Sequence, residues 1–158
     1  MFTRKQHFPD SDNNSLFLWG ARQTGKSTLL KSLYPNALWF DLLLSDVYER
    51  LLRQPTYLRE TVLANPELQQ VVIDEIQRIP ALLNEIHWLI TNTAVQFILS
   101  GSSPRKIIRS ETNLLGGRAL RYELLPLASA EIPDFDLIRA LNNGLLPRHY
   151  LASNPKRM

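Results

Sequence analysis

Short apolar runs alternate along this chain with stretches of helical periodicity, a pattern typical of an α/β domain with a mostly parallel sheet. Five runs predict buried strands, at residues 16–19, 37–43, 71–74, 95–99 and 119–125. Polar or glycine-containing segments bound them, as expected where strands end at the surface. The pattern therefore predicts a five-stranded sheet.

Helical patterns fill the intervals between these runs. Residues 26–34 place three leucines on one face, and residues 45–64 predict two helices interrupted near Pro55. A further amphipathic helix is predicted to begin at Pro80, and a last one to cover about residues 136–142. Helices between successive strands indicate one α/β domain with helices against its sheet.

The composition excludes several classes of protein. The chain has 158 residues, of which 44% are hydrophobic and 21% charged, and this excludes a disordered or low-complexity protein. The absence of cysteine excludes disulfides, zinc–thiolate sites, iron–sulfur clusters and thiol catalysis. No apolar run could cross a bilayer, and the first ten residues lack the apolar segment of a secretory signal. We expect a cytoplasmic domain with no membrane partner.

The sequence GARQTGKS at residues 20–27 fits the phosphate-loop pattern G-x-x-x-x-G-K-[ST]. It lies directly after a predicted strand and opens a helix, so backbone N–H groups and the helix N-terminus would face phosphate oxygens. We expect Lys26 to reach the β- and γ-phosphates, Ser27 to ligate Mg²⁺, and Thr28 to contact the α-phosphate, whereas Arg22 braces the loop. The predicted ATP-binding residues are Gly20, Ala21, Arg22, Gln23, Thr24, Gly25, Lys26, Ser27 and Thr28.

Two acids follow the third apolar run. Asp74 ends the predicted strand, at the carboxyl edge where open α/β sheets bind ligands, and is predicted to hold the Mg²⁺ shell through water. Glu75 is predicted to polarise the water that attacks the γ-phosphate. Alone, such a pair also fits a solvated strand end, but the phosphate loop upstream favours a metal and catalytic site.

The order of the motifs refines the expected class. One predicted strand lies between the phosphate loop and the acidic strand, so the acidic strand is not expected to be the immediate neighbour of the first. Together with Glu75, this order fits hydrolytic ATPases better than nucleoside kinases or GTPases. The chain has no Asn-Lys-x-Asp guanine-binding motif, which favours ATP over GTP. The predicted fold is a P-loop NTPase, a three-layer sandwich around five strands.

Further catalytic candidates follow the fourth strand and precede the fifth. We predict that Ser102 senses the γ-phosphate or orients water; Ser100 is placed equally well, and a helix N-cap is an alternative role for either. Arg118 is predicted to act as an arginine finger, on a neighbouring subunit in many ATPases. A surface arginine without a catalytic part is the alternative.

Positive charge is concentrated in one window of a chain whose net charge is +3. Residues 101–121 hold five basic residues and one acid, a net charge of +4; these are Arg105, Lys106, Arg109, Arg118, Arg121 and Glu111. Such a patch fits the rim of an anionic ligand site or, alternatively, a nucleic-acid surface.

Five segments in order resemble the prokaryotic AAA-domain ATP-binding proteins: GARQTGKSTLL, VVIDEIQRIPALL, QFILSGSS, LLGGRALRYELLPLASAEI and NNGLLP. The resemblance covers about residues 14–150. It implies an AAA-like core, ATP and Mg²⁺ as ligands, and ATP hydrolysis. It also implies that Lys26 and Ser27 contact phosphate and metal, that Asp74 and Glu75 form the acidic pair, and that Arg118 is the arginine of the family's Gly-Arg motif.

The resemblance also predicts how the chain is divided. We expect an N-terminal extension at 1–13, the AAA-like core at 14–132, and the start of a C-terminal helical region at 133–158. Family members usually run to several hundred residues, so we expect a truncated chain without a helical lid and C-terminal domain. The alternative function is a nucleotide-dependent switch with little turnover, which would act through self-association, a partner protein or DNA.

Overall fold

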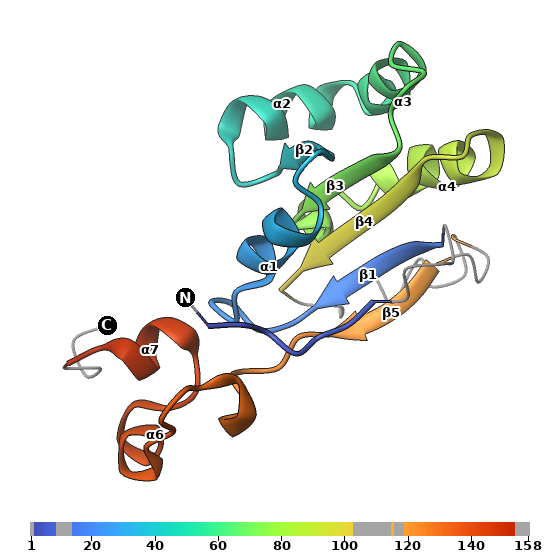
Figure 1. Cartoon of the computed structure of the whole chain (residues 1–158). Coiled ribbons are helices and arrows are strands. Elements are labelled where there is room, and N and C mark those ends of the chain that lie inside the picture. Colours follow the sequence, from blue (N-terminus) through green and yellow to red (C-terminus); the bar gives the residue numbers. More distant parts are fainter. Residues whose placement is uncertain (1, 9–13, 103–114, 116–118, 154–158) are drawn as a thin grey trace.

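The computed structural model describes residues 2–8, 14–102, 115 and 119–153. Its single sheet is entirely parallel, with the strand order β2-β3-β4-β1-β5 (Figure 1). The strands are β1 (Ser15–Trp19), β2 (Leu38–Asp41), β3 (Gln70–Asp74), β4 (Gln96–Gly101) and β5 (Ala119–Glu123). All five predicted strands are present, and β3 is not a neighbour of β1, as the order of the motifs predicted. β4 lies between them.

Helices cover both faces of this sheet. The α-helices are α1 (Lys26–Leu33), α2 (Ser45–Arg53), α3 (Thr56–Leu63), α4 (Leu82–Asn92), α6 (Leu137–Asn143) and α7 (Pro147–Leu151), and the 3₁₀ helices are η1 (Ile76–Arg78) and η2 (Ser129–Glu131). α1 crosses one face, and α4 lies on the opposite face (Figure 1). The protein is therefore the predicted three-layer α/β sandwich.

Alternation along the strands builds the two cores. Leu16, Leu18 and Val72 point to the α1 face, whereas Val71 and Ile73 point to the face covered by α2, α3 and α4. Because both faces are covered, every position of β3 after its first residue is buried. This burial explains why the strands appear in the sequence as continuous apolar runs.

The second strand is shorter than the predicted range of 37–43. It ends at Asp41, whose Oδ1 accepts a hydrogen bond from the backbone N–H of Leu43 at 2.9 Å. The N–H of Leu44 bonds to the carbonyl of Asp41 at 3.1 Å and closes a turn. An aspartate that bonds to the backbone two residues later favours a turn over a strand, so Leu43 and Leu44 are exposed rather than buried.

A third apolar cluster joins the two ends of the described chain. Leu127, Ile132 and Tyr150 are its buried members, and Phe2 packs against them. The predicted C-terminal helix is α6, whose N-terminus is capped by the Asp136 side chain. α7 follows it and was not predicted. No helix in the described ranges is long and apolar enough to traverse a bilayer.

Candidate nucleotide site

A cleft of about 610 Å³ lies at the carboxyl ends of the central strands. The phosphate loop and the start of α1 form one side of it, and Glu75 lies on another. The remaining lining residues come from the segment after β2 and from α7; they are Leu43, Pro147 and Arg148. Parallel sheets place their ligands at this edge, and the loop and acidic motifs meet here as predicted.

The phosphate loop needs glycine at two positions. A Cβ on Gly20 would lie 2.4 Å from the carbonyl oxygen of Leu124, so only glycine lets the loop leave β1 at this point. Gly25 has φ of 94°, a left-handed conformation that glycine adopts without steric cost. Between them, Thr24 is fully buried, and its hydroxyl donates to the carbonyl of Ala21 at 2.9 Å. The two glycines and the buried Thr24 together fix the backbone conformation of the loop.

Lys26 is buried in the loop rather than extended into solvent. Its Nζ donates to the carbonyl oxygens of Gly20 at 2.8 Å and Ala21 at 3.1 Å. Burial lowers the pKa of Lys26 from its ordinary value; Glu75 and Asp74 oppose this effect, and the charge of Arg22 adds to it. The ammonium is thus desolvated and held beside the cleft, where an anionic phosphate would compensate its charge.

Two hydroxyl groups converge on the carboxylate of Asp74, which is 3% exposed. Ser27 Oγ donates to Asp74 Oδ2 at 2.5 Å, and Ser100 Oγ donates to Oδ1. Ser27 opens α1 and Ser100 lies in β4, so three elements meet at one carboxylate. A hydroxyl beside a carboxylate is a donor set that suits Mg²⁺, which takes few protein ligands and keeps several waters.

Glu75 has a different environment from its neighbour. It adopts a left-handed conformation with φ of 61°, which is unusual for a residue other than glycine. Ser102 Oγ donates to Glu75 Oε2 at 3.0 Å, and Gln77 Nε2 donates to the same oxygen. A Cβ on Gly101 would lie 2.4 Å from Gln77 Oε1, so this glycine makes room for the glutamine amide.

The structure places most of the predicted site residues at this edge. Lys26, Ser27, Thr28, Arg22 and Gln23 line the cleft with Gly25 and Glu75, and Asp74 bonds to Ser27 below them. Ser100 and Ser102 both lie at this edge, but they bond to different acids: Ser100 to Asp74 and Ser102 to Glu75. Arg118 falls outside the described residues, as do Arg105, Lys106, Arg109 and Glu111, so their predicted roles stay predictions.

Three further residues belong to this site although no motif assigned them a role. Gln77 lies two positions after Glu75, and its side-chain amide donates to the Glu75 carboxylate. The VVIDEIQ segment includes this glutamine, but nothing in the segment indicated the contact. Pro147 and Arg148 line the cleft from α7. The segment NNGLLP was the available signal for them, because it ends in the proline that begins this helix.

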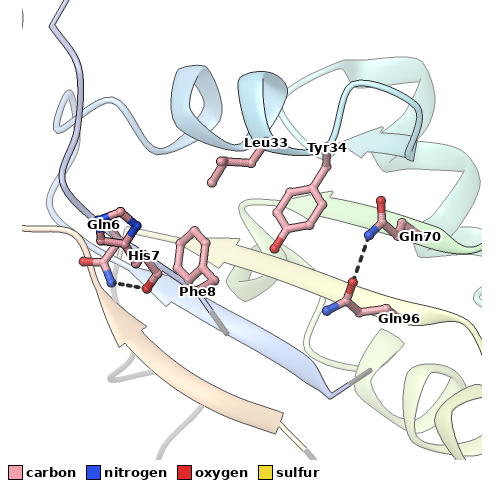
Figure 2. Close-up of a pocket in the computed structure, with 7 residues that line it drawn as sticks. All are labelled: Gln6, His7, Phe8, Leu33, Tyr34, Gln70 and Gln96. Atoms are coloured by element: carbon pink, nitrogen blue, oxygen red, sulfur yellow. Dashed lines mark hydrogen bonds between the residues drawn. The ribbon is translucent and has the colours of Figure 1, made fainter. Parts of the chain in front are cut away.

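A second, smaller pocket lies at the opposite ends of β3 and β4 and has a different character (Figure 2). It measures about 190 Å³ and is lined by Gln6, His7, Phe8, Leu33, Tyr34, Gln70 and Gln96. Gln70 Nε2 donates to Gln96 Oε1 at 3.0 Å across the two strands. Its lining contains no lysine or arginine, so a phosphate ligand is better matched by the first cleft.

Comparison with known proteins matches most of the chain to a protein family. The family model that describes an AAA domain matches residues 12–133. Among solved structures, Cdc6p from Pyrobaculum aerophilum matches with a TM-score of 0.52 and 14% identity, over 74% of this chain and 40% of that one. The Orc1 protein of Aeropyrum pernix, solved in complex with DNA, matches with a TM-score of 0.46 and 16% identity, over 75% of this chain and 41% of that one.

The match to Cdc6p shows a shared fold and no more, because the identity is low. This chain spans about 40% of the length of the Cdc6p structure. No curated protein matches the sequence significantly.

Proposed function

Because the chain belongs to the AAA-domain family, we propose that it binds ATP with Mg²⁺ in this cleft and hydrolyses it to ADP and phosphate. The contact between Ser27 and Asp74 carries the proposal most directly. It joins the phosphate loop to the acidic strand, 47 residues apart in sequence, and leaves a hydroxyl and a carboxylate beside the cleft. Mg²⁺ and nucleoside triphosphates are bound together by that combination. We propose a cytoplasmic location, where ATP is available.

Binding is proposed to begin with the loop. The backbone N–H groups of residues 20–28 and the N-terminus of α1 would hold the phosphate oxygens, and Lys26 would exchange its carbonyl partners for the β- and γ-phosphates. Ser27 and Asp74 would hold Mg²⁺, Asp74 through water. When bound, the cation neutralises charge on the phosphate oxygens. Exposed Thr28 would contact the α-phosphate.

Hydrolysis is proposed to depend on Glu75. The hydrogen-bond donors to Glu75 among the described residues are Ser102 and Gln77, and both contact Oε2. The two bonds orient the carboxylate and leave Oε1 to accept a proton from the attacking water, whose oxygen bonds to the γ-phosphorus as the bond to ADP breaks. Arg118 is proposed to stabilise the charge that develops in this step, from the same or a neighbouring subunit.

The test is phosphate release from ATP by the wild-type chain and by the Glu75→Gln variant, with ATP affinity measured on the same samples. We expect Glu75→Gln to bind ATP about as tightly as wild type. We expect it to release phosphate at least about 100-fold more slowly, which is the usual size of a general-base effect. Equal rates in the two proteins would remove Glu75 from the mechanism.

The same experiment separates the ATPase from the switch. A wild-type chain that binds ATP without turnover, even at concentrations that favour self-association, would support a nucleotide-dependent interaction module instead. Association with DNA stays a proposal that rests on the charge of residues 101–121. A salt-dependent DNA affinity that is lost in the double variant Arg105→Ala and Arg109→Ala would support it.

A further inference from the structure

The N-terminal segment 2–8 is fixed at both ends against other parts of the molecule. Phe2 packs edge-on against Tyr150 of α7, with ring centroids 6.1 Å apart, and Phe8 packs against Tyr122 of β5 at 4.9 Å. Arg4 lies between these two anchors and points toward the phosphate loop. A long side chain held in this way has already lost most of the conformational freedom that binding would otherwise cost.

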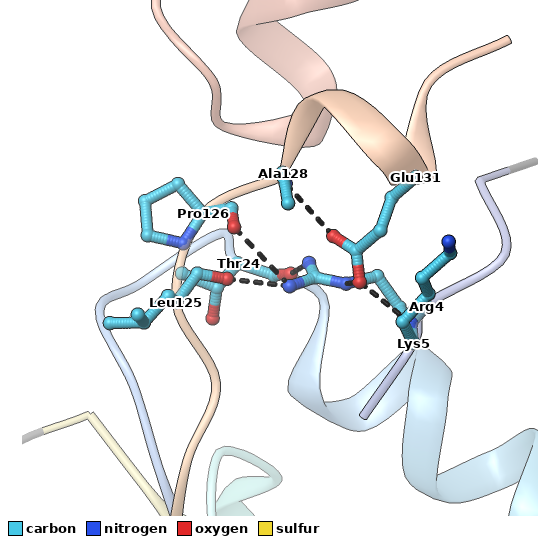
Figure 3. Close-up of polar contacts among 7 residues, drawn as sticks. All are labelled: Arg4, Lys5, Thr24, Leu125, Pro126, Ala128 and Glu131. Carbon is cyan, nitrogen blue, oxygen red and sulfur yellow. Dashed lines mark hydrogen bonds and ion pairs between the residues drawn. The ribbon is translucent and has the colours of Figure 1, made fainter. Parts of the chain in front are cut away.

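Every arm of the Arg4 guanidinium has an acceptor (Figure 3). Nε donates to Glu131 Oε1 at 3.2 Å, one terminal nitrogen donates to the carbonyl oxygen of Thr24 at 2.8 Å, and the other to that of Leu125 at 2.6 Å. The Arg4 side chain is 9% exposed and that of Glu131 is 6% exposed. The Arg4 guanidinium thus connects the N-terminal segment, the phosphate loop and the segment after β5.

The contact with Thr24 determines the direction of a peptide group inside the phosphate loop. The described chain has no cis peptide bond, so the carbonyl of Thr24 and the N–H of Gly25 point in opposite directions across one planar unit. Arg4 holds this carbonyl from outside the cleft, because Arg4 is not among the residues that line it. The N–H of Gly25 therefore points away from Arg4, and Gly25 itself lines the cleft.

We propose that Arg4 is a positioning residue for phosphate binding, which acts by orienting the Thr24–Gly25 peptide. This inference rests on the proposed nucleotide site and deepens it. The positive charge of Arg4 is not itself a phosphate ligand, because Glu131 neutralises it at 3.2 Å. Its effect is that of a charge-assisted hydrogen bond on the carbonyl, which polarises the peptide and strengthens its N–H as a donor.

The experiment measures affinity for two probes, MgATP and inorganic tripolyphosphate with Mg²⁺, in Arg4→Gln and Arg4→Lys. Lysine keeps the charge but lacks the planar fork, so it cannot hold Thr24, Leu125 and Glu131 together. We expect both variants to lose about tenfold in affinity for both probes, as for one lost hydrogen bond to a charged group. Lys5→Gln is the matched control, because the Lys5 side chain is exposed and only its backbone N–H bonds to Glu131. It should stay within about twofold of wild type.

Unfolding temperatures without ligand separate positioning from a purely structural brace. If the Arg4 variants unfold at lower temperature but bind both probes as wild type does where they are folded, the inference is overturned. Should Arg4→Gln fail to fold, Arg4→Lys decides the question by the same comparison. Wild type that binds neither probe would overturn the proposed function itself, whereas tight binding by wild type and Arg4 variants alike would overturn only the role of Arg4.

Discussion

Asp74 and Glu75 are adjacent in the sequence, yet their side chains have separate partners. Asp74 is buried beneath the loop and accepts from Ser27 and Ser100, whereas the left-handed backbone at Glu75 turns its carboxylate toward Ser102. The sequence was sufficient to predict that two acids meet at this edge with a serine from the end of the fourth strand, but it left open whether that serine is Ser100 or Ser102. It could not assign the pairs, because the backbone conformation at Glu75 has no signal in the residue types around it.

This division of partners predicts different effects for two serine variants. Ser102→Ala removes one of the two donors to Glu75, so we expect phosphate release to fall about 2- to 10-fold with ATP affinity nearly unchanged. Ser100→Ala leaves Asp74 Oδ1 without its hydroxyl donor in a buried site, so we expect a loss of about 1–3 kcal/mol in the free energy of unfolding. Phosphate release and urea unfolding check the two outcomes. A reversed pattern would contradict the assignment of the serines.

At the scale of elements, the strands and long helices are predictable and the short C-terminal elements are not. β3 is recognisable because it is buried on both faces, and α4 because its buried leucines repeat along one face. α7 has only five residues, of which Tyr150 alone is buried. Its place depends on tertiary contacts with Phe2 and on the bond from the Leu127 N–H to the Leu145 carbonyl at 2.8 Å, none of which is local in sequence.

One connection between elements is predicted to be sensitive to pH. Glu131 of η2 accepts from the N–H groups of Lys5 and Ala128 and pairs with Arg4. Burial is the largest influence on the pKa of Glu131 and acts to raise it, but these three partners together outweigh burial and lower it from the ordinary 4.5. The carboxylate therefore stabilises the fold fully above about pH 4.5, and this stabilisation is lost as pH falls through the lowered pKa.

The measurement is the unfolding free energy of wild type and Glu131→Gln, by urea titration from pH 7 down to about pH 3.5. We expect wild type to be more stable by about 1–3 kcal/mol at pH 7 and the difference to shrink below pH 4.5. A difference that is constant over this range would mean that the charge of Glu131 does not contribute, and that only its shape and neutral hydrogen bonds do.

For the whole molecule, topology explains why distant motifs form one site. The strand order puts β4 between β1 and β3, so the phosphate loop, Asp74 and the serines at the end of β4 arrive at the same edge of the sheet. From the order of the motifs, only the separation of β1 from β3 and the shared edge of the phosphate loop and Asp74 were predicted. The residues that line the far side of the cleft could not be predicted, because Arg148 comes from the C-terminal helix α7. The contact of Arg4 with the phosphate loop could not be predicted either, because Arg4 lies near the other end of the chain.

The most direct test of the nucleotide site is thermal unfolding of wild type and Lys26→Ala, each with and without MgATP. Ligand at about 100 times its dissociation constant should stabilise wild type by about 2.7 kcal/mol, which raises the unfolding temperature by roughly 5–10 °C for a chain of this size. We expect that shift in wild type and none in Lys26→Ala, since the variant lacks the buried ammonium beside the cleft. Equal shifts in both proteins, or no shift in wild type, would contradict the proposal that this cleft holds the nucleotide.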